Sequence, residues 1–166
     1  MITIPNQIGQ GGKFLNTELE SILRTSAAFG SVNVATVVSP ETAGNSAADV
    51  NAAIGGAEAK FVQEVTLTLQ DEDGNVLEAF DGSVGPVGVL SIADTSAAGT
   101  AAIDPASIQD VNGNDKPIFV NGVATVLINY TGTWVATETV TLTLTNADMA
   151  EANGGNTVTF VDTLVA

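Results

Sequence analysis

The sequence contains neither cysteine nor histidine, and these two absences exclude much of enzyme chemistry. Ser-His-Asp and Cys-His nucleophiles cannot be assembled, and the usual zinc site loses its nitrogen and sulfur ligands. Two-carboxylate glycoside chemistry remains open, but one Trp, one Tyr and six Phe offer few platforms for sugar rings. No phosphate-binding glycine motif is present. We therefore expect no enzyme activity and no cofactor.

Basic residues are almost as scarce, with four against nineteen acids and a net charge of −15. Binding to DNA or RNA requires clustered Lys or Arg that neutralise phosphates, so we expect no nucleic-acid partner. No apolar run approaches the ~18 residues of a membrane span, and the first residues lack the pattern of a signal peptide. The expectation is a soluble protein, made in the cytoplasm and without a membrane partner.

The first sixteen residues are irregular, with Pro5 and three glycines, yet they carry several large apolar side chains. Two interpretations stay open: a frayed terminus, or an extended arm laid across a partner. If the segment is an arm, its expected contact residues are Ile2, Ile4, Ile8, Phe14 and Leu15.

A helix is predicted at residues 17–29. Thr17 and Glu20 have the spacing of a capping box, in which each side chain accepts a hydrogen bond from the other's backbone N–H. Gly30 is expected to end the helix. One apolar stripe follows the helical period, formed by Leu19, Ile22, Leu23 and Ala27.

Residues 31–38 alternate as a strand, and Pro40 follows them. Residues 39–59 are rich in Ala, Gly, Ser and Asn, which predicts a long linker with a short helical turn near residues 47–54. The expected domain boundary therefore lies near Lys60, between an N-terminal attachment region at 1–59 and a β domain at 60–166.

From Lys60 onward the sequence predicts only strands. In residues 64–70 the apolar side chains point one way and the polar ones the other, as a strand requires. Short strands between Gly, Asn and Asp turns indicate a mainly β, antiparallel sandwich, here with an N-terminal extended arm and one short α-helix. The predicted strands are 61–70, 75–80, 87–93, 100–103, 117–121, 123–130, 134–145 and 156–165.

The acidic stretch DEDGN, residues 71–75, is either a calcium loop or a turn. An EF-hand loop that began at Asp71 would need glycine at position 6 and glutamate at position 12, whereas glycine stands at position 4 and at position 12. Asp-Gly and Gly-Asn dipeptides instead indicate a hairpin turn, as does DVNGND at 110–115. A catalytic carboxylate pair is disfavoured because an exposed turn has no apolar pocket. Asp71, Asp73 and Asn75 remain a weak metal candidate, since a cation would relieve the repulsion between the acids.

Tyr130 and Trp134 are the only Tyr and Trp of the chain. Either could stack on a surface ligand such as a glycan. A single Trp at the start of a strand more often packs in the core or at a sheet edge, so packing is the favoured interpretation.

The order of these features resembles the bacterial immunoglobulin-like modules of the invasin and intimin kind. Both have a strand that leads to a D-x-DGN turn, a later N-G-x-A strand and a final V-T-L-T strand. The resemblance covers residues 61–147 and implies an immunoglobulin-like β-sandwich. The matching residues are Asp71, Asp73, Gly74, Asn75, Asn121, Gly122, Ala124 and Thr141 to Thr143.

A short single module with a helix-bearing N-terminal region is also similar to the capsid decoration (cement) and head-fibre proteins of tailed phages. This similarity implies attachment through the N-terminal region to a major capsid protein, usually as trimers. The expected location is the capsid exterior of a virion assembled in the host cytoplasm. The alternative is a carbohydrate- or cell-surface-binding module whose partner is a host-surface glycan.

Overall fold

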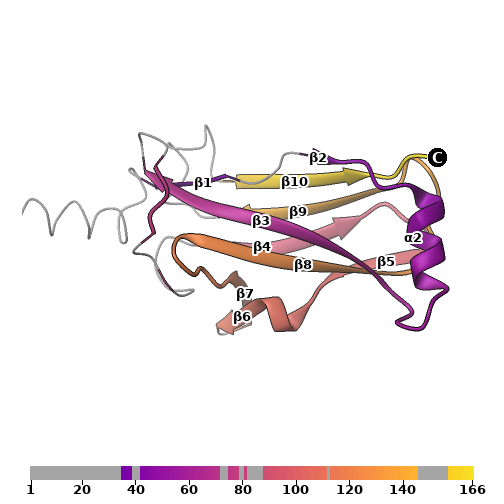
Figure 1. The fold of residues 1–166 in the computed structure, drawn as a ribbon, viewed down its shortest axis with the longest axis horizontal. Helices are drawn as coiled ribbons and strands as arrows, with labels where there is room; N and C mark the ends of the chain where they lie inside the picture. The colour runs from indigo at the N-terminus through magenta and orange to yellow at the C-terminus, as the bar shows by residue number, and fades with distance from the viewer. Residues whose placement is uncertain are drawn as a thin grey trace, which may run out of the picture.

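The computed structural model describes residues 35–38, 42–71, 75–78, 81, 88–111, 113–145 and 157–166, without the side chains of 35–38, Asp71 and Val111. This part of the chain forms two facing β-sheets with one α-helix at an end (Figure 1). The predicted arm at 1–16 and helix at 17–29 lie outside the described residues.

The first sheet has four antiparallel strands in the order β1-β3-β8-β5. The central pair is β3 with β8, in register with Val65 opposite Val126. The bounds of the strands are Ala35–Val38 for β1, Phe61–Asp71 for β3, Val123–Gly132 for β8 and Gly99–Ile103 for β5.

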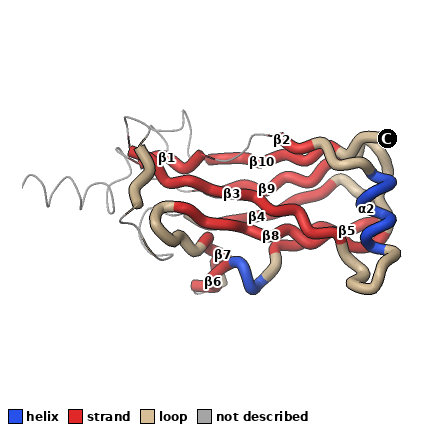
Figure 2. Tube along the Cα trace, viewed as in Figure 1, coloured by secondary structure: helices blue, strands red, loops and turns tan. Residues whose placement is uncertain are grey.

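The second sheet has the order β2-β10-β9-β4, in which only the short β2 runs parallel to its neighbour. Between β5 and β8, two neighbouring strands of the first sheet, the chain forms a 3₁₀ turn, η2, and a separate hairpin of β6 with β7 (Figure 2). The bounds are Thr42–Ala43 for β2, Thr157–Thr163 for β10, Thr139–Thr145 for β9, Val89–Asp94 for β4, Pro105–Ser107 for η2, Ile108–Val111 for β6 and Asn114–Pro117 for β7.

This strand order is that of the immunoglobulin fold. The order β1-β3-β8-β5 corresponds to strands A-B-E-D, and β10-β9-β4 corresponds to G-F-C. The short β2 adds one parallel strand beside β10. The predicted immunoglobulin-like sandwich is confirmed, although the inter-sheet disulfide usual in such domains is absent, because the chain has no cysteine.

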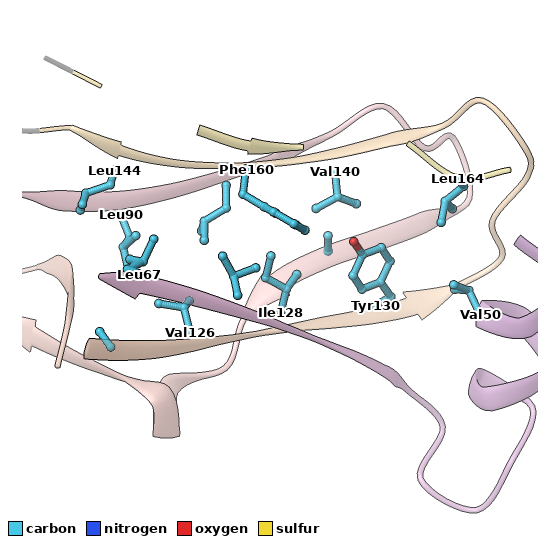
Figure 3. Close-up of a cluster of buried hydrophobic side chains, with 14 of the residues drawn as sticks. Val50, Leu67, Leu90, Val126, Ile128, Tyr130, Val140, Leu144, Phe160 and Leu164 are labelled. Atoms are coloured by element: carbon cyan, nitrogen blue, oxygen red, sulfur yellow. The ribbon is translucent and has the colours of Figure 1, made fainter. Parts of the chain in front are cut away.

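The core lies between the sheets and follows from the alternation in the strands. In β8 and β9 every second side chain is buried, and the intervening ones are half-buried or exposed. Figure 3 shows the inward side chains of both sheets meeting, with Val50 of the helix at one end of the cluster. The largest fully buried side chains are Trp134, Tyr130, Phe119, Leu67, Leu69, Ile128, Leu142, Leu144 and Leu164.

The helix α2, Ala47–Ile54, closes the end of the sandwich beside the C-terminus (Figure 1). Ser46 caps its first turn by accepting a 3.5 Å hydrogen bond from the Asp49 backbone N–H. Ala47 and Val50 are buried in the core, while the rest of the helix is half-buried or exposed. The short helix expected at 47–54 is therefore confirmed.

Residues 42–59 are not the linker that the sequence predicted. Thr42 and Ala43 pair with β10, and α2 contributes two core side chains. Small side chains bury little surface each, but they pack well where a helix lies close against the ends of β3 and β8. The sandwich thus includes residues on the N-terminal side of the boundary expected near Lys60.

Several predicted strands differ in extent from the observed ones. Of the strand expected at 75–80, only Val76 pairs within the described residues 75–78, as a single bridge to Gln70. The strand expected at 134–145 begins at Thr139, because Trp134 belongs to the connection between β8 and β9. The region 117–121 contains the end of β7 and a bridge from Val120 to Val123.

Candidate functional site

The chain reverses direction across the DEDGN stretch. Gln70 and Val76 pair antiparallel, and the Leu77 N–H donates a 2.9 Å hydrogen bond to the Leu69 carbonyl. This pairing confirms the predicted reversal from the residues that flank it. Asn75 is exposed, whereas Asp73 and the side chain of Asp71 lie outside the described residues. Among the residues that the structure describes, no group of acids is arranged to hold a metal ion.

The second predicted turn, at 110–115, joins β6 to β7. Val111 pairs with Asn114, so two residues form the turn. Gly113 has a φ of 80°, and its N–H donates a 2.7 Å hydrogen bond to the Asp110 carboxylate. The carboxylate therefore stabilises the turn that glycine permits, and the hairpin prediction is confirmed.

Tyr130 and Trp134 are packed inside the sandwich. Their exposed fractions are 0% and 1%, and their ring centroids lie 5.0 Å apart. Trp134 donates from Nε1 to the Thr131 carbonyl at 2.9 Å. A Cβ on Gly99 would lie 2.5 Å from the indole, so the ring uses the space that this glycine leaves. The favoured interpretation, that Tyr130 and Trp134 pack inside the fold, is confirmed, and the alternative of a surface-ligand contact is wrong because both side chains fill the core.

The interior also holds a polar cluster that joins the sheets. Asp162, the one charged residue among the described residues that is fully buried, accepts a 2.7 Å hydrogen bond from the Tyr130 hydroxyl. Its carboxylate also accepts from the Asn45 side chain at 2.6 Å and from the Asn45 backbone N–H at 3.1 Å. The Asn45 amide donates in addition to the Gln63 side chain at 2.7 Å. The cluster therefore ties the segment after β2 to both sheets.

This cluster is structural rather than reactive. Burial raises the pKa of Tyr130 far above its usual value of 10, and the hydrogen bond to Asp162 raises it further. The phenol therefore stays protonated and donates to the carboxylate. A gap in the apolar core, lined by residues that include Leu67 and Phe160, is too narrow to admit water. The hydroxyl and the carboxylate satisfy each other, and neither is presented to a substrate.

Sequence patterns alone did not identify this cluster, although one signal was available. In β10 the buried positions are Phe160 and Asp162, and Leu164 follows at the same spacing. An acid at an inward position of an alternating strand indicates a buried polar contact. The partner Asn45 gives no such signal, because it lies 117 residues away in a segment without a regular pattern.

A surface ion pair connects the first sheet to the η2 turn. Lys60 Nζ lies 3.7 Å from Asp104 Oδ2, which also accepts a 3.0 Å hydrogen bond from the Asn129 amide. The hydrogen bond from the Ala106 N–H, followed by the one from Asn129, holds the pKa of Asp104 below its usual value. These groups fix the turn to β8.

The predicted arm contacts Ile2, Ile4, Ile8, Phe14 and Leu15 lie outside the described residues, so these predictions stand untested. Within the described residues, no helix is long and apolar enough to cross a membrane. Comparison of the chain with known protein families and with curated proteins finds no match.

Proposed function

We propose that this chain is a structural virion protein, a capsid decoration (cement) protein that binds the outer surface of a phage capsid and stabilises it. The observation that carries the proposal is the way its polar and aromatic side chains are used. Internal packing and internal hydrogen bonds occupy the side chains of Tyr130, Trp134 and Asp162. Such a domain is suited to being displayed, while the chain that precedes β1 supplies the attachment.

The residues proposed to grip the capsid are Ile2, Ile4, Ile8, Phe14 and Leu15. Each contact would be modest, but many copies on a symmetric shell reinforce one another. The proposed partner is the major capsid protein, and the proposed state is a homo-oligomer, with a trimer favoured. A net charge of −15 on each copy would keep decorated particles apart in solution.

Co-sedimentation tests the proposal with the intact chain. Purified protein is mixed with capsids built from the major capsid protein that is encoded in the same genome, and the pellet is analysed. We expect the wild type to pellet with the capsids and the double variant Ile4→Asp/Ile8→Asp to stay in the supernatant. The matched control Gln7→Asp/Gln10→Asp adds the same charge to the same segment but keeps its apolar side chains, and should still pellet. Wild-type protein that stays in the supernatant would overturn the proposal.

The alternative of a glycan-binding module has no observation in its favour among the described residues. Its two candidate residues, Tyr130 and Trp134, are buried. It therefore ranks behind the capsid proposal.

A further inference from the structure

Three valines form an exposed apolar patch at the end of the sandwich where β3 ends and β8 begins. Val76, Val120 and Val123 have exposed fractions of 38%, 60% and 37%. Val120 is the most exposed large apolar side chain among the described residues. We call these three residues the valine patch.

Backbone pairing holds the valine patch together on one face. Val120 and Val123 form a bridge with two hydrogen bonds, 2.8 and 3.1 Å long. Val123 pairs with Thr68 and Val76 pairs with Gln70, two positions of β3 that share the outer side of the first sheet. A Cβ on Gly122 would lie 3.1 Å from Val76 Cγ1, which places the bend of the hairpin directly against Val76.

Acidic side chains lie beside these valines. Glu78 is exposed two residues after Val76. The exposed Asp81 accepts a 2.7 Å hydrogen bond from the Asn121 N–H, in the bend next to Val120. A fitting occupant is therefore an apolar segment with positive rather than negative charge, since a second acidic sandwich end would be repelled.

One segment of this chain has that chemistry. Residues 1–16 carry Lys13 and no Asp or Glu, in a chain whose net charge is −15. They also contain the large apolar residues Ile2, Ile4, Ile8 and Phe14. Their charge and apolar content thus complement the valine patch and its acidic neighbours.

The connection is long enough and starts in the right place. Ala35, the first described residue, pairs with Asp71 on one edge of β3, and Val76 pairs on the other edge. Two strand spacings, about 10 Å, therefore separate β1 from Val76. The helix predicted at 17–29 would span about 20 Å and residues 30–34 about 16 Å more if extended, so the connection is longer than the distance to be bridged.

We propose that residues 1–16 bind back onto the valine patch of the same molecule when the protein is free in solution. The patch then shields the apolar residues of the segment until a partner competes for them. This inference does not depend on the capsid proposal, since it concerns the isolated protein.

The absence of cysteine allows a direct test in the full-length chain. A nitroxide spin label is attached to the variant Gln10→Cys. The intensity of each amide NMR signal is then measured before and after reduction of the nitroxide, and the ratio gives the intensity loss caused by the label. We expect Val76, Val120 and Val123 to lose intensity, and Val135, in the connection beyond β8 at the other end, to lose none. Adding Val120→Asp should restore the intensities at Val76 and Val123. Val135→Asp is the matched control, because Val135 is 58% exposed, and it should leave the loss unchanged.

The result is read only from variants whose spectra keep the dispersion of the folded protein, and Val123→Thr replaces Val120→Asp if the latter unfolds. No loss at the valine patch, or an equal loss at both ends, would overturn the proposal. A mixture of spin-labelled protein that lacks ¹⁵N with ¹⁵N protein that carries no spin label detects contacts between molecules only. It therefore distinguishes binding between two copies from binding within one molecule. Intensity loss that appears equally in this mixture would overturn binding within one molecule in favour of exchange between copies.

Discussion

The Tyr130 hydroxyl lies 2.7 Å from Asp162 Oδ2, and this hydrogen bond crosses the core from β8 in one sheet to β10 in the other. Two further donors of Asn45 complete the contacts of the carboxylate. The Asp162 carboxylate therefore accepts three hydrogen bonds and donates none. An immunoglobulin-like domain without a disulfide here has a hydrogen-bonded connection between its sheets.

Replacing Tyr130 by Phe should destabilise the domain by about 1–3 kcal/mol, because a buried acceptor loses one of its donors. Urea denaturation measures the change in the free energy of unfolding. Asp162→Asn should also be destabilising, since its NH₂ group would face donors. The exposed Val135→Ala serves as the control. A Tyr130→Phe variant as stable as the wild type would show that the hydrogen bond contributes nothing.

Alkaline pH should weaken the wild-type domain. The pKa of Tyr130 is raised in the folded state, so above pH ~10 the unfolded chain loses a proton that the folded chain keeps. This contribution is fully present below pH ~10, and it falls by about 1.4 kcal/mol per pH unit above that.

Denaturation from pH 8 to 11.5 measures this slope, and Tyr130→Phe should remove it. Tyr130 is the only tyrosine, so tyrosinate absorbance reports it directly. Ionisation of Tyr130 near pH 10 without unfolding would contradict the prediction.

Substituting Ala for Gly99 should destabilise the domain by about 1–3 kcal/mol through overpacking. The added Cβ would lie 2.5 Å from the Trp134 ring, which is rigid and itself buried. Trp134 fluorescence would follow both the packing change and the unfolding transition. The matched control is Gly44→Ala, whose Cβ would meet its nearest atoms at an ordinary 3.8 Å. Equal stabilities of the two variants would contradict the steric account.

Removing the Asn51 side chain should loosen α2 from the sandwich. Its amide donates to the Trp134 carbonyl at 2.7 Å and accepts from the Trp134 N–H at 2.9 Å. Asn51→Ala should cost about 1–3 kcal/mol, because both backbone groups lose their partner.

Ala52→Asn, at an exposed position of the same helix, measures the effect of helix propensity alone, which is at most about 0.7 kcal/mol. Hydrogen exchange of the α2 amides is the second readout, and it should accelerate in Asn51→Ala. Unchanged exchange and stability would show that the helix does not depend on this contact.

The sequence predicted the central strands because alternation is a local property. The bounds expected for β3, β8 and β10 agree with the observed ones within one or two residues. Both turns were also predicted, since positive φ at Gly113 and the reversal after Gln70 follow from residue type within a few positions. The resemblance implied an immunoglobulin-like sandwich, and the strand order of the two sheets confirms that fold.

Tertiary structure alone decided where the polar and aromatic groups point. Trp134 is buried because Gly99, 35 positions earlier, leaves room for its ring, and Asp162 is satisfied because Asn45 lies beside it. The composition of residues 39–59 predicts a linker, because small side chains bury little surface. The alternation of apolar and polar residues along each strand determines which side chains face the core. The partner of each buried group depends on distant segments that come together only when the two sheets pack against each other.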